Sequence, residues 1–483
     1  MIESMRAIHW FRSDLRLRDN TALAAAAARA DEMAMVFVFD DRLLSGSRVG
    51  PPRLRFLWDA LERLAGDLKQ RGHRLVLRRG DPVAEIPRLI RETGAEWLSF
   101  NRDPGPYAQL RDARTRSAAE RAGARALDCK DRVLFESADL RTRTGRPYRV
   151  YTPFRRAWLA RFREDRPLPA GPTRLPRPIP GLAAGRIPNL ADFGAAGDRT
   201  RIPLAGEAAA RRRLQRFLEG RIGDYASRRE EPAVNGTSRL SPFLRFGLIS
   251  PRTCAEAVLE VAAAFPGRAG GAWKWIDELI WREFYSAILE EHPHVLVRSF
   301  RPEYQAVRWN DDEELFRAWR EGRTGYPFVD AAMRQLEREG WMHNRARMVV
   351  ASFLTKDLLL DWRWGERFFM QRLVDGEPAS NNGGWQWSAS TGTDAQPYFR
   401  IFNPVAQGER FDPGGRYVRR FVPELRGVPD RHVHRPWGSP RPPRGYPAPI
   451  VDHAHQRQLA LARYQAARRK APRRSGRREG RIG

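Results

Sequence analysis

Residues 341–403 hold the side chains whose types and spacing point most clearly to chemistry. Within them, residues 381–384 read Asn-Asn-Gly-Gly and stand directly before Trp385 and Trp387. Glycine forfeits packing and raises the entropy cost of ordering the chain, so an ordinary core has little use for two of them there. We expect a tight turn at residues 381–384, with a large planar group that is polar at its edges lying against it.

The segment 236–247, GTSRLSPFLRFG, groups hydroxyl side chains around one arginine. Thr237, Ser238 and Ser241 can donate hydrogen bonds, and Arg239 adds a fixed positive charge, so the segment suits a phosphate. Serine or threonine before an apolar run is also a common helix N-cap. Taken alone, the cap is the simpler interpretation.

Residues 273–285, WKWIDELIWREFY, have the spacing of a helix with one buried side. Glu278, Trp281, Arg282 and Tyr285 fall three or four residues apart and share another face. A carboxylate one turn from an indole suits hydrogen bonding and stacking to a base that has left a duplex. The alternative is a surface ion pair between Glu278 and Arg282, worth a few tenths of a kcal/mol.

The segment WMHNRARM, residues 341–348, places Asn344 and Met348 on one helical face with Arg347 next to both. Asn344 can bond a base edge while Met348 packs on a pyrimidine, and Arg347 can pair with Asp375. Such a pair can also be a buried ion pair without catalytic meaning.

Other catalytic motifs are missing from the sequence. The nine histidines have no carboxylate or thiol at ligand-like offsets, so we expect no metal site. Neither a phosphate-binding loop nor a nucleophile elbow occurs, and the first strand is not followed by G-x-G-x-x-G.

The elements that position these motifs divide the chain in two. Five apolar runs, at residues 7–11, 34–39, 74–78, 96–100 and 124–129, alternate with helical patterns such as those at 51–71 and 81–94. This alternation predicts a doubly wound parallel sheet, whereas helical periodicity dominates beyond residue 207. A stretch rich in proline, from residue 166, resists both helix and sheet. We predict an α/β domain at 1–130, a linker region at 131–206, an all-α domain at 207–463 and a disordered basic tail at 464–483.

The balance of charge indicates a polyanionic partner. The 483 residues include 86 Lys and Arg against 58 Asp and Glu, a formal net charge of +28. Nucleic acid is the commonest partner of so basic a surface, although a GC-rich genome also raises the arginine content. The chain enters a strand at once, has no apolar run long enough to cross a bilayer and contains two cysteines. We expect a cytoplasmic monomer that binds nucleic acid and no membrane.

Taken in order and spacing, these motifs resemble the DNA photolyase and cryptochrome family, and most closely the bacterial class I cyclobutane pyrimidine dimer photolyases. The resemblance implies an α/β domain joined to a helical domain that binds FAD. The residues that match the family's FAD contacts are Tyr225, Thr237, Ser238, Arg239, Leu240, Ser241, Trp275, Arg282, Arg347, Asp375, Glu377 and Asn381.

The resemblance also implies an activity, the repair of pyrimidine dimers in UV-damaged DNA by blue-light-driven electron transfer from reduced FAD. The matching catalytic residues are Glu278, Asn344, Met348 and Trp387. The matching DNA-binding residues are Arg229, Glu278, Trp281, Tyr285, Asn344, Arg345 and Trp387. Trp309, Trp362 and Trp385 coincide with the family's electron-transfer chain, although three of fifteen tryptophans taken by themselves are ordinary core residues.

Two matches bear on the choice of substrate. Photolyases carry Asn at the position of Asn381, facing flavin N5, whereas plant cryptochromes carry Asp, so the residue favours repair over signalling. Enzymes for (6-4) photoproducts have a catalytic His where this chain has Asn344, which argues against that lesion.

The sequence departs from the family at two places. Glu377 stands where many members have Asp, which puts the flavin contact of this side chain in doubt. Folate-binding members carry Asn-Glu where this chain has Tyr107 and Ala108. We therefore expect a deazaflavin antenna, or none, rather than methenyltetrahydrofolate.

Three other functions stay open. A cryptochrome-type blue-light photoreceptor would use the same flavin site, and a cryptochrome relative would repair single strands. A plain nucleic-acid-binding protein would explain the charge but not the glycines beside the tryptophans.

Overall fold

The computed structural model describes residues 4–170 and 173–470, and its first part is a twisted parallel sheet in the strand order β3-β2-β1-β4-β5. The prediction of a doubly wound sheet is confirmed. The strands are β1 (Arg6–Phe11), β2 (Glu32–Phe39), β3 (Leu75–Arg79), β4 (Trp97–Asn101) and β5 (Arg125–Cys129). The helices between them are α1 (Thr21–Ala27), α2 (Asp41–Leu44), α3 (Pro51–Lys69), α4 (Pro82–Thr93) and α5 (Pro106–Arg121).

Alternation along β1 divides its side chains between two apolar cores. Ile8 and Trp10 face the core that includes Leu89 of α4. Ala7 and Phe11 point the other way, as successive strand residues do, into a core that also holds α3. This second core continues into the helical half of the chain, so one face of the sheet has no boundary with the helices.

The region between the two halves is more ordered than its composition suggests. It contains helix α6 (Tyr151–Glu164) and a two-residue strand, β6 (Arg177–Pro178), which pairs in parallel with the start of β2. The expectation that this proline-rich stretch forms no sheet is therefore wrong at β6. Strand β6 pairs with residues 32–33 of β2, whereas β3 pairs with β2 only from Met35 onward. The start of β2 therefore has a free edge, where a strand that contains proline can pair.

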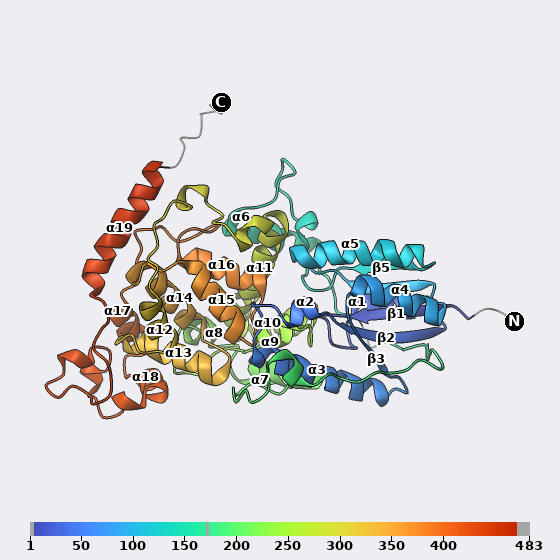
Figure 1. Cartoon of the computed structure of the whole chain (residues 1–483), viewed down its shortest axis with the longest axis horizontal. Helices are drawn as coiled ribbons and strands as arrows, with labels where there is room; N and C mark the ends of the chain where they lie inside the picture. Colours follow the sequence, from blue (N-terminus) through green and yellow to red (C-terminus); the bar gives the residue numbers. More distant parts are fainter. Residues whose placement is uncertain (1–3, 171–172, 471–483) are drawn as a thin grey trace.

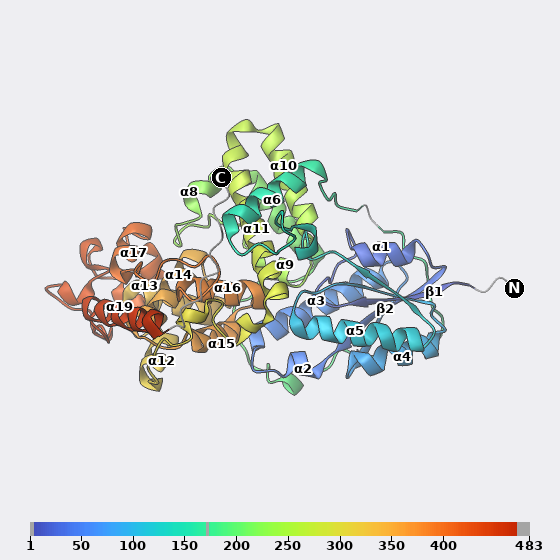
Figure 2. The ribbon, with the colours of Figure 1, turned by 90° about the horizontal axis from the view of Figure 1, so that it is seen from above.

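The second half is helical, as predicted, and lies opposite the sheet in Figure 1. Its first helices are α7 (Glu207–Gly220), α8 (Tyr225–Arg228), α9 (Ser241–Arg245), α10 (Pro251–Ala264), α11 (Ala269–Glu291) and α12 (Glu313–Arg320). The remainder are α13 (Pro327–Glu339), α14 (Asn344–Ser352), α15 (Trp362–Arg372), α16 (Pro378–Ser388), α17 (Pro404–Phe411), α18 (Arg416–Phe421) and α19 (His453–Lys470). Figure 2 shows α11 near the middle of the view, with α16 on one side and the sheet on the other, and its contacts with α6, α8, α10 and α16 make it the central helix of this half.

The tail differs from expectation where the structure describes it. Residues 464–470 belong to α19, and Tyr464 is fully buried, because its ring packs against Tyr304 and its hydroxyl donates to the Ala389 carbonyl. The expected disorder is therefore wrong for these seven residues, and residues 471–483 lie outside the described part. The division of the chain into domains stays a prediction.

None of the helices described here is long and apolar enough to span a bilayer. Nor do the described residues gather three or more His, Cys, Asp or Glu side chains into a cluster that could hold a metal ion.

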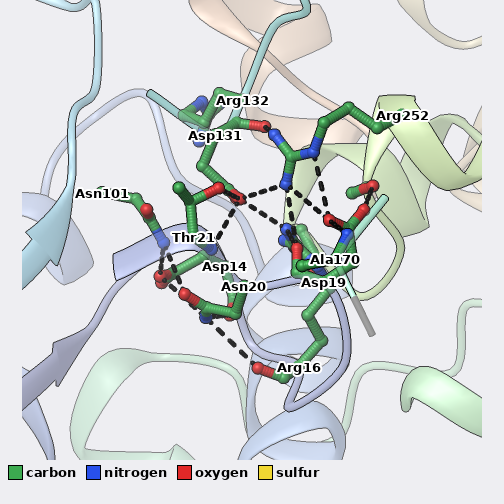
Figure 3. A network of polar contacts seen from close by, with 12 residues as sticks. Asp14, Arg16, Asp19, Asn20, Thr21, Asn101, Asp131, Arg132, Ala170 and Arg252 are labelled. Carbon is green, nitrogen blue, oxygen red and sulfur yellow. Dashed lines mark hydrogen bonds and ion pairs between the residues drawn. The ribbon is translucent and has the colours of Figure 1, made fainter. Parts of the chain in front are cut away.

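A buried ionic network joins the exit of β1 to the helical half (Figure 3). The Asp131 carboxylate lies 2.7 Å from both Arg16 and Arg252, and Arg252 reaches Asp19 at 3.1 Å. All four side chains are nearly inaccessible to solvent. Burial would raise the pKa of Asp131, but the two guanidinium groups hold it well below its usual range.

We expect Asp131→Asn to lower the free energy of unfolding by about 3–5 kcal/mol, because two buried arginines lose their shared carboxylate. Chemical denaturation at pH 7 measures the change. Asp41→Asn is the control, since its ion pair with Arg79 is half exposed and worth less than about 1 kcal/mol.

The pH dependence has a defined sign. Because the folded pKa of Asp131 is depressed, its contribution is complete above the unfolded value near 4 and is lost as pH falls below it. A variant whose stability deficit persists unchanged at acidic pH would contradict this assignment.

Candidate functional site

The loop before α9 is tied to the central helix through one hydroxyl. The indole nitrogen of Trp275 on α11 donates to the Ser238 hydroxyl at 3.2 Å, and both residues are buried. Tyr225 lies behind them, since the ring of Phe217 contacts both Tyr225 and Trp275. The expected phosphate-binding segment therefore meets the central helix, and Thr237, which precedes Ser238, is half-buried.

The backbone of this loop has the geometry of an anion-binding turn. Arg239 has a φ of 50°, and Leu240 follows in the right-handed helical region. Adjacent residues of opposite hand turn successive backbone N–H groups toward one concave side. The Arg239 guanidinium stacks 4.2 Å over the ring of Trp341 and pairs with Glu339 at 3.3 Å, while Ser241 accepts from the Trp341 indole at 3.4 Å. Burial lowers the pKa of Arg239, and Glu339 opposes that shift.

The predicted pairing of Arg347 with Asp375 is confirmed. One Arg347 nitrogen lies 2.8 Å and 3.1 Å from the two carboxylate oxygens of Asp375, and its Nε donates to the Met342 carbonyl at 2.9 Å. Asp375 is buried, and the Arg347 guanidinium is held on one side by this carboxylate and on the other by the Met342 carbonyl. The Arg282 guanidinium, expected beside the same ligand, donates to the Arg132 carbonyl at 2.5 Å.

Residues 381–384 form no turn, which corrects the expectation from sequence. They lie inside helix α16, and the two glycines serve close approach instead of special dihedrals. A methyl group on Gly383 would overlap the ring of Tyr285 on α11. The same group on Gly384 would meet no protein atom within 4 Å. One glycine thus lets two helices touch, and the other leaves a space beside the helix.

The first turn of α16 fixes the amide and the acid that sequence singled out. The Glu377 carboxylate caps the helix by accepting from the Ser380 N–H at 2.8 Å. The Asn381 side chain donates to the Glu366 carbonyl at 3.0 Å, which sets the orientation of its amide. Glu377 therefore has a structural task in place of Asp, namely the cap.

Four charged residues form a continuous chain across the face where DNA contacts were predicted. Glu278 pairs with Arg229, Arg229 lies 3.2 Å from Glu230, and Glu230 lies 2.8 Å from Arg345. Burial would raise the pKa of Glu230, but Arg345 and Arg229 lower it overall. Both arginines predicted to bind DNA are thus already paired with acids.

Helix α14 begins where a buried histidine caps it, and this presents Asn344 to solvent. The Nδ1 of His343 accepts from the Arg345 N–H at 3.2 Å, as a neutral imidazole can, since burial lowers its pKa to about 4. Asn344 is exposed, and its amide lies 3.9 Å from the Met348 sulfur one turn on. The shared face of Asn344 and Met348 is confirmed.

The aromatic side chains predicted to contact a base are held from behind. Trp281 stacks on Tyr151 of α6, with ring centroids 3.6 Å apart and an angle of 6°. Trp387 lies one helical turn after Gly383, on the face of α16 that packs against Tyr285. Sequence reasoning missed Tyr151 and Glu230. The segment YTPFRRAW, from residue 151, has the pattern of a helix, but it lies in the region predicted to be a linker, so its residues were not considered for the site.

The three tryptophans lie in one region of the helical half. Trp362 and Trp385 belong to the same apolar core, and Trp309 packs against its edge with partial exposure. The Asn310 N–H donates to the Leu359 carbonyl at 2.7 Å, which brings Trp309 beside the start of α15, while Gly365 of α15 touches the Trp385 ring. One partly exposed tryptophan and two buried ones agree with an electron-transfer chain that begins at the surface, and the transfer itself stays a prediction.

Comparisons with known proteins decide the family. Residues 7–173 match the family model described as DNA photolyase, and residues 275–466 match the FAD binding domain of DNA photolyase. A deoxyribodipyrimidine photo-lyase of Halobacterium salinarum is 41% identical over 95% of this chain and 99% of its own. The chain belongs to the DNA photolyase family.

Two solved photolyase structures are similar along the whole length. The class III photolyase of Agrobacterium tumefaciens superimposes with a TM-score of 0.90 at 38% identity, covering 97% of this chain and 99% of that one. An archaeal photolyase from Sulfolobus tokodaii, described as containing two FAD molecules, gives a TM-score of 0.81 at 32% identity, covering 96% and 100%. The expected similarity to class I in particular stays a prediction.

The residues of the photolyase-type FAD-binding domain fit that cofactor. The turn at Arg239 and Leu240 offers backbone donors for a diphosphate, and the Arg347–Asp375 pair offers charges to the edge of a ring system. Among the described residues, the buried indole nitrogen of Trp385 has no hydrogen-bond partner. Together with the space beside Gly384, these features suit a polar planar ligand.

Two neighbouring glycines provide a matched test of α16. We expect Gly383→Ala to lower the free energy of unfolding by about 1–3 kcal/mol, because the methyl overlaps Tyr285. In the FAD-free chain, Gly384→Ala should be neutral or stabilising by up to about 1 kcal/mol through helix propensity. Urea unfolding of both variants measures this, and equal effects would show that the packing against α11 is not the cause.

Proposed function

We propose that this photolyase repairs cyclobutane pyrimidine dimers in DNA under blue light, with reduced FAD as its cofactor. The observation that carries the proposal is the joined group of Glu278, Arg229, Glu230 and Arg345, which borders Asn344 and the Trp281 stack. An exposed amide, a carboxylate and aromatic faces, surrounded by arginines, suit an extruded dinucleotide held by its phosphates. Deoxyribodipyrimidine photo-lyases of near-equal length support the same reaction.

The chain's own residues bind and orient the dimer. Asn344 hydrogen-bonds a base edge, and Met348, one turn away, packs on the pyrimidine ring. Glu278 hydrogen-bonds the dimer, and the adjacent Arg229 guanidinium offsets the added negative charge during cleavage. Trp281 and Trp387 stack on the extruded bases, with Tyr151 keeping the Trp281 ring in place.

FAD, when bound, supplies the light-driven electron that opens the cyclobutane ring. Arg347 and Asp375 hold its ring edge, and Thr237, Ser238 and the backbone at Arg239 hold its diphosphate. Tyr225, Leu240, Ser241, Trp275, Arg282, Glu377 and Asn381 complete the set of residues that we assign to the cofactor. Trp385, Trp362 and Trp309 would carry an electron inward from the surface.

A second chromophore fits a cavity between the two halves. A cavity of about 370 Å³ lies between α5 and α11 and is lined by residues such as Phe100, Asp103, Arg132, Phe135 and Glu283. Burial would raise the pKa of Asp103, but Arg132, Arg245 and Arg12 hold it far below its usual range. The cavity lining as a whole contains more carboxylates than guanidinium groups, so its charge does not by itself favour an anionic chromophore.

Tyr107, at a position where folate-binding members carry Asn-Glu, has another use here. The Tyr107 hydroxyl donates to the Asp40 carboxylate, and burial together with that contact raises the pKa of Tyr107 to about 12. The side chain is thus committed to a partner within the protein. This supports a deazaflavin or flavin antenna, or none, over methenyltetrahydrofolate.

The first experiment is repair of a single thymine dimer in duplex DNA, in blue light and in darkness, with reductant. We expect light-dependent restoration of the thymines and a loss of about tenfold in repair rate for Glu278→Ala, which removes a charged hydrogen-bond acceptor. Bound flavin without repair of either duplex or single strands would favour the cryptochrome alternative.

Binding to the lesion is tested separately in the dark. Trp387→Ala should weaken binding to damaged duplex by about 5-fold to 150-fold, because stacking contributes about 1–3 kcal/mol per base. Trp437→Ala, which removes an exposed tryptophan elsewhere, should leave binding unchanged. Affinity for any duplex should fall as salt rises, and an unaltered affinity for Trp387→Ala would remove this residue from the lesion site.

A further inference from the structure

The loop between α15 and α16 is held by the α/β half of the molecule, and Arg53 of α3 is the central contact. Arg53 is only 4% exposed, and its guanidinium donates to the Gly376 carbonyl at 2.8 Å and to the Met370 carbonyl at 2.7 Å. It also donates to the Arg48 carbonyl. Arg245 of α9 donates to the same Gly376 carbonyl at 2.9 Å.

Arg53 has no carboxylate within ion-pair distance among the described residues, which makes its burial costly. Burial and the neighbouring Arg245 lower its pKa to about 9, while Asp375 and Glu366 oppose the shift from farther away. The guanidinium bonds one carbonyl of α15 and one carbonyl of the loop that follows it, so it fixes that loop relative to both α15 and α3.

Neighbours of Arg53 hold the same region. Arg48 pairs with Glu366 at 3.3 Å, and the Gln371 amide donates to the Ser47 carbonyl at 3.0 Å. A methyl group on Gly50 would overlap the Gln371 carbonyl, so the backbones touch. Residues 47–53 therefore clasp α15 and the loop that follows it.

The loop held by residues 47–53 and the helix that follows it carry side chains that we assign to the cofactor. Asp375, which pairs with Arg347, directly precedes Gly376, and Glu377 caps α16 directly after it. Asn381 bonds the carbonyl of Glu366, the residue whose carboxylate Arg48 holds. Contacts from residues 47–53 thus reach both Asp375 and Asn381 through one intermediate residue each.

The Arg53 guanidinium packs closely against the backbone of Gly376. Its φ lies outside the left-handed region, so glycine is not required for conformation. A methyl group at this position would overlap the Arg53 guanidinium. Arg53 therefore requires glycine at position 376, because a side chain there would occupy the space of its guanidinium.

We propose that Arg53, assisted by Arg48, is a positioning residue of the flavin site, through which the α/β half sets the orientation of Asp375 and Asn381. The inference rests on the proposed function only in requiring that the chain bind FAD. It gives the α/β half a part in the cofactor site that is independent of any antenna.

The test compares FAD affinity, flavin absorption spectrum and flavin midpoint potential in the reconstituted full chain. We expect Arg53→Met to raise the Kd for FAD about tenfold, and to shift the spectrum and potential of the flavin that does bind. Arg53→Lys, which keeps the charge, should recover part of the affinity. Arg55→Met is the control, because Arg55 lies on the same helix and pairs with Asp198 away from the loop.

A second variant tests the contact from the other side and covers a failure of Arg53→Met to fold. Gly376→Ala should shift the flavin spectrum in the same direction, and Arg53→Met combined with it should be no worse than Gly376→Ala alone, because the methyl then has room. Unchanged FAD affinity and spectrum in Arg53→Met, or effects of the two substitutions that simply add, would overturn the inference. Wild-type chain that binds no FAD would overturn the proposed function as well, which distinguishes the two failures.

Discussion

The buried carboxylate of Asp131 is the constraint on which the rest of the molecule depends. It satisfies one arginine from the exit of β1 and another from the start of α10, so the sheet and the helices cannot move apart without leaving buried guanidinium groups unpaired. The apolar core shared by the sheet and the central helices also holds the two halves together, but apolar contacts are not directional. The ionic contacts fix a single orientation of the sheet relative to the helices, which the apolar core alone does not. Every other contact between the two halves depends on that orientation.

The functional site follows from that fixed orientation. Helix α11 presents residues from one end to the other: Trp275 to the phosphate loop, Glu278 to Arg229, Trp281 to Tyr151 and Tyr285 to Gly383. A single rigid helix thus sets the spacing between the residues that we assign to the cofactor and those that we assign to the lesion. Small shifts in its packing would change several of these contacts together, because interiors packed this densely do not deform locally.

Sequence predicted well whatever depends on period and local pairing. The strands, the helical half and the shared face of Asn344 and Met348 follow from spacing, whereas the pair of Arg347 with Asp375, 28 residues apart, was a hypothesis from residue type alone. It failed where a residue's reason lies in a distant partner. Gly383 and Gly384 suggested a turn because nothing in the sequence reveals that Tyr285 needs one of the absent side chains. Likewise the last seven residues of α19 were predicted to be a disordered tail, because the buried partners of Tyr464 come from remote segments. Nor does the sequence indicate that Arg53 reaches Gly376.

In the chain of alternating charges from Glu278 to Arg345, the protein's own carboxylates compete with DNA phosphates for the two arginines. Any phosphate that binds Arg229 or Arg345 must displace, or share the guanidinium with, a carboxylate that already holds it. Undamaged DNA offers the same phosphates but no extruded bases to compensate for that exchange. An internal anion placed this way would discriminate against the vast excess of intact sequence, so part of the selectivity that we propose would come from Glu230, an acid to which we assign no contact with a base.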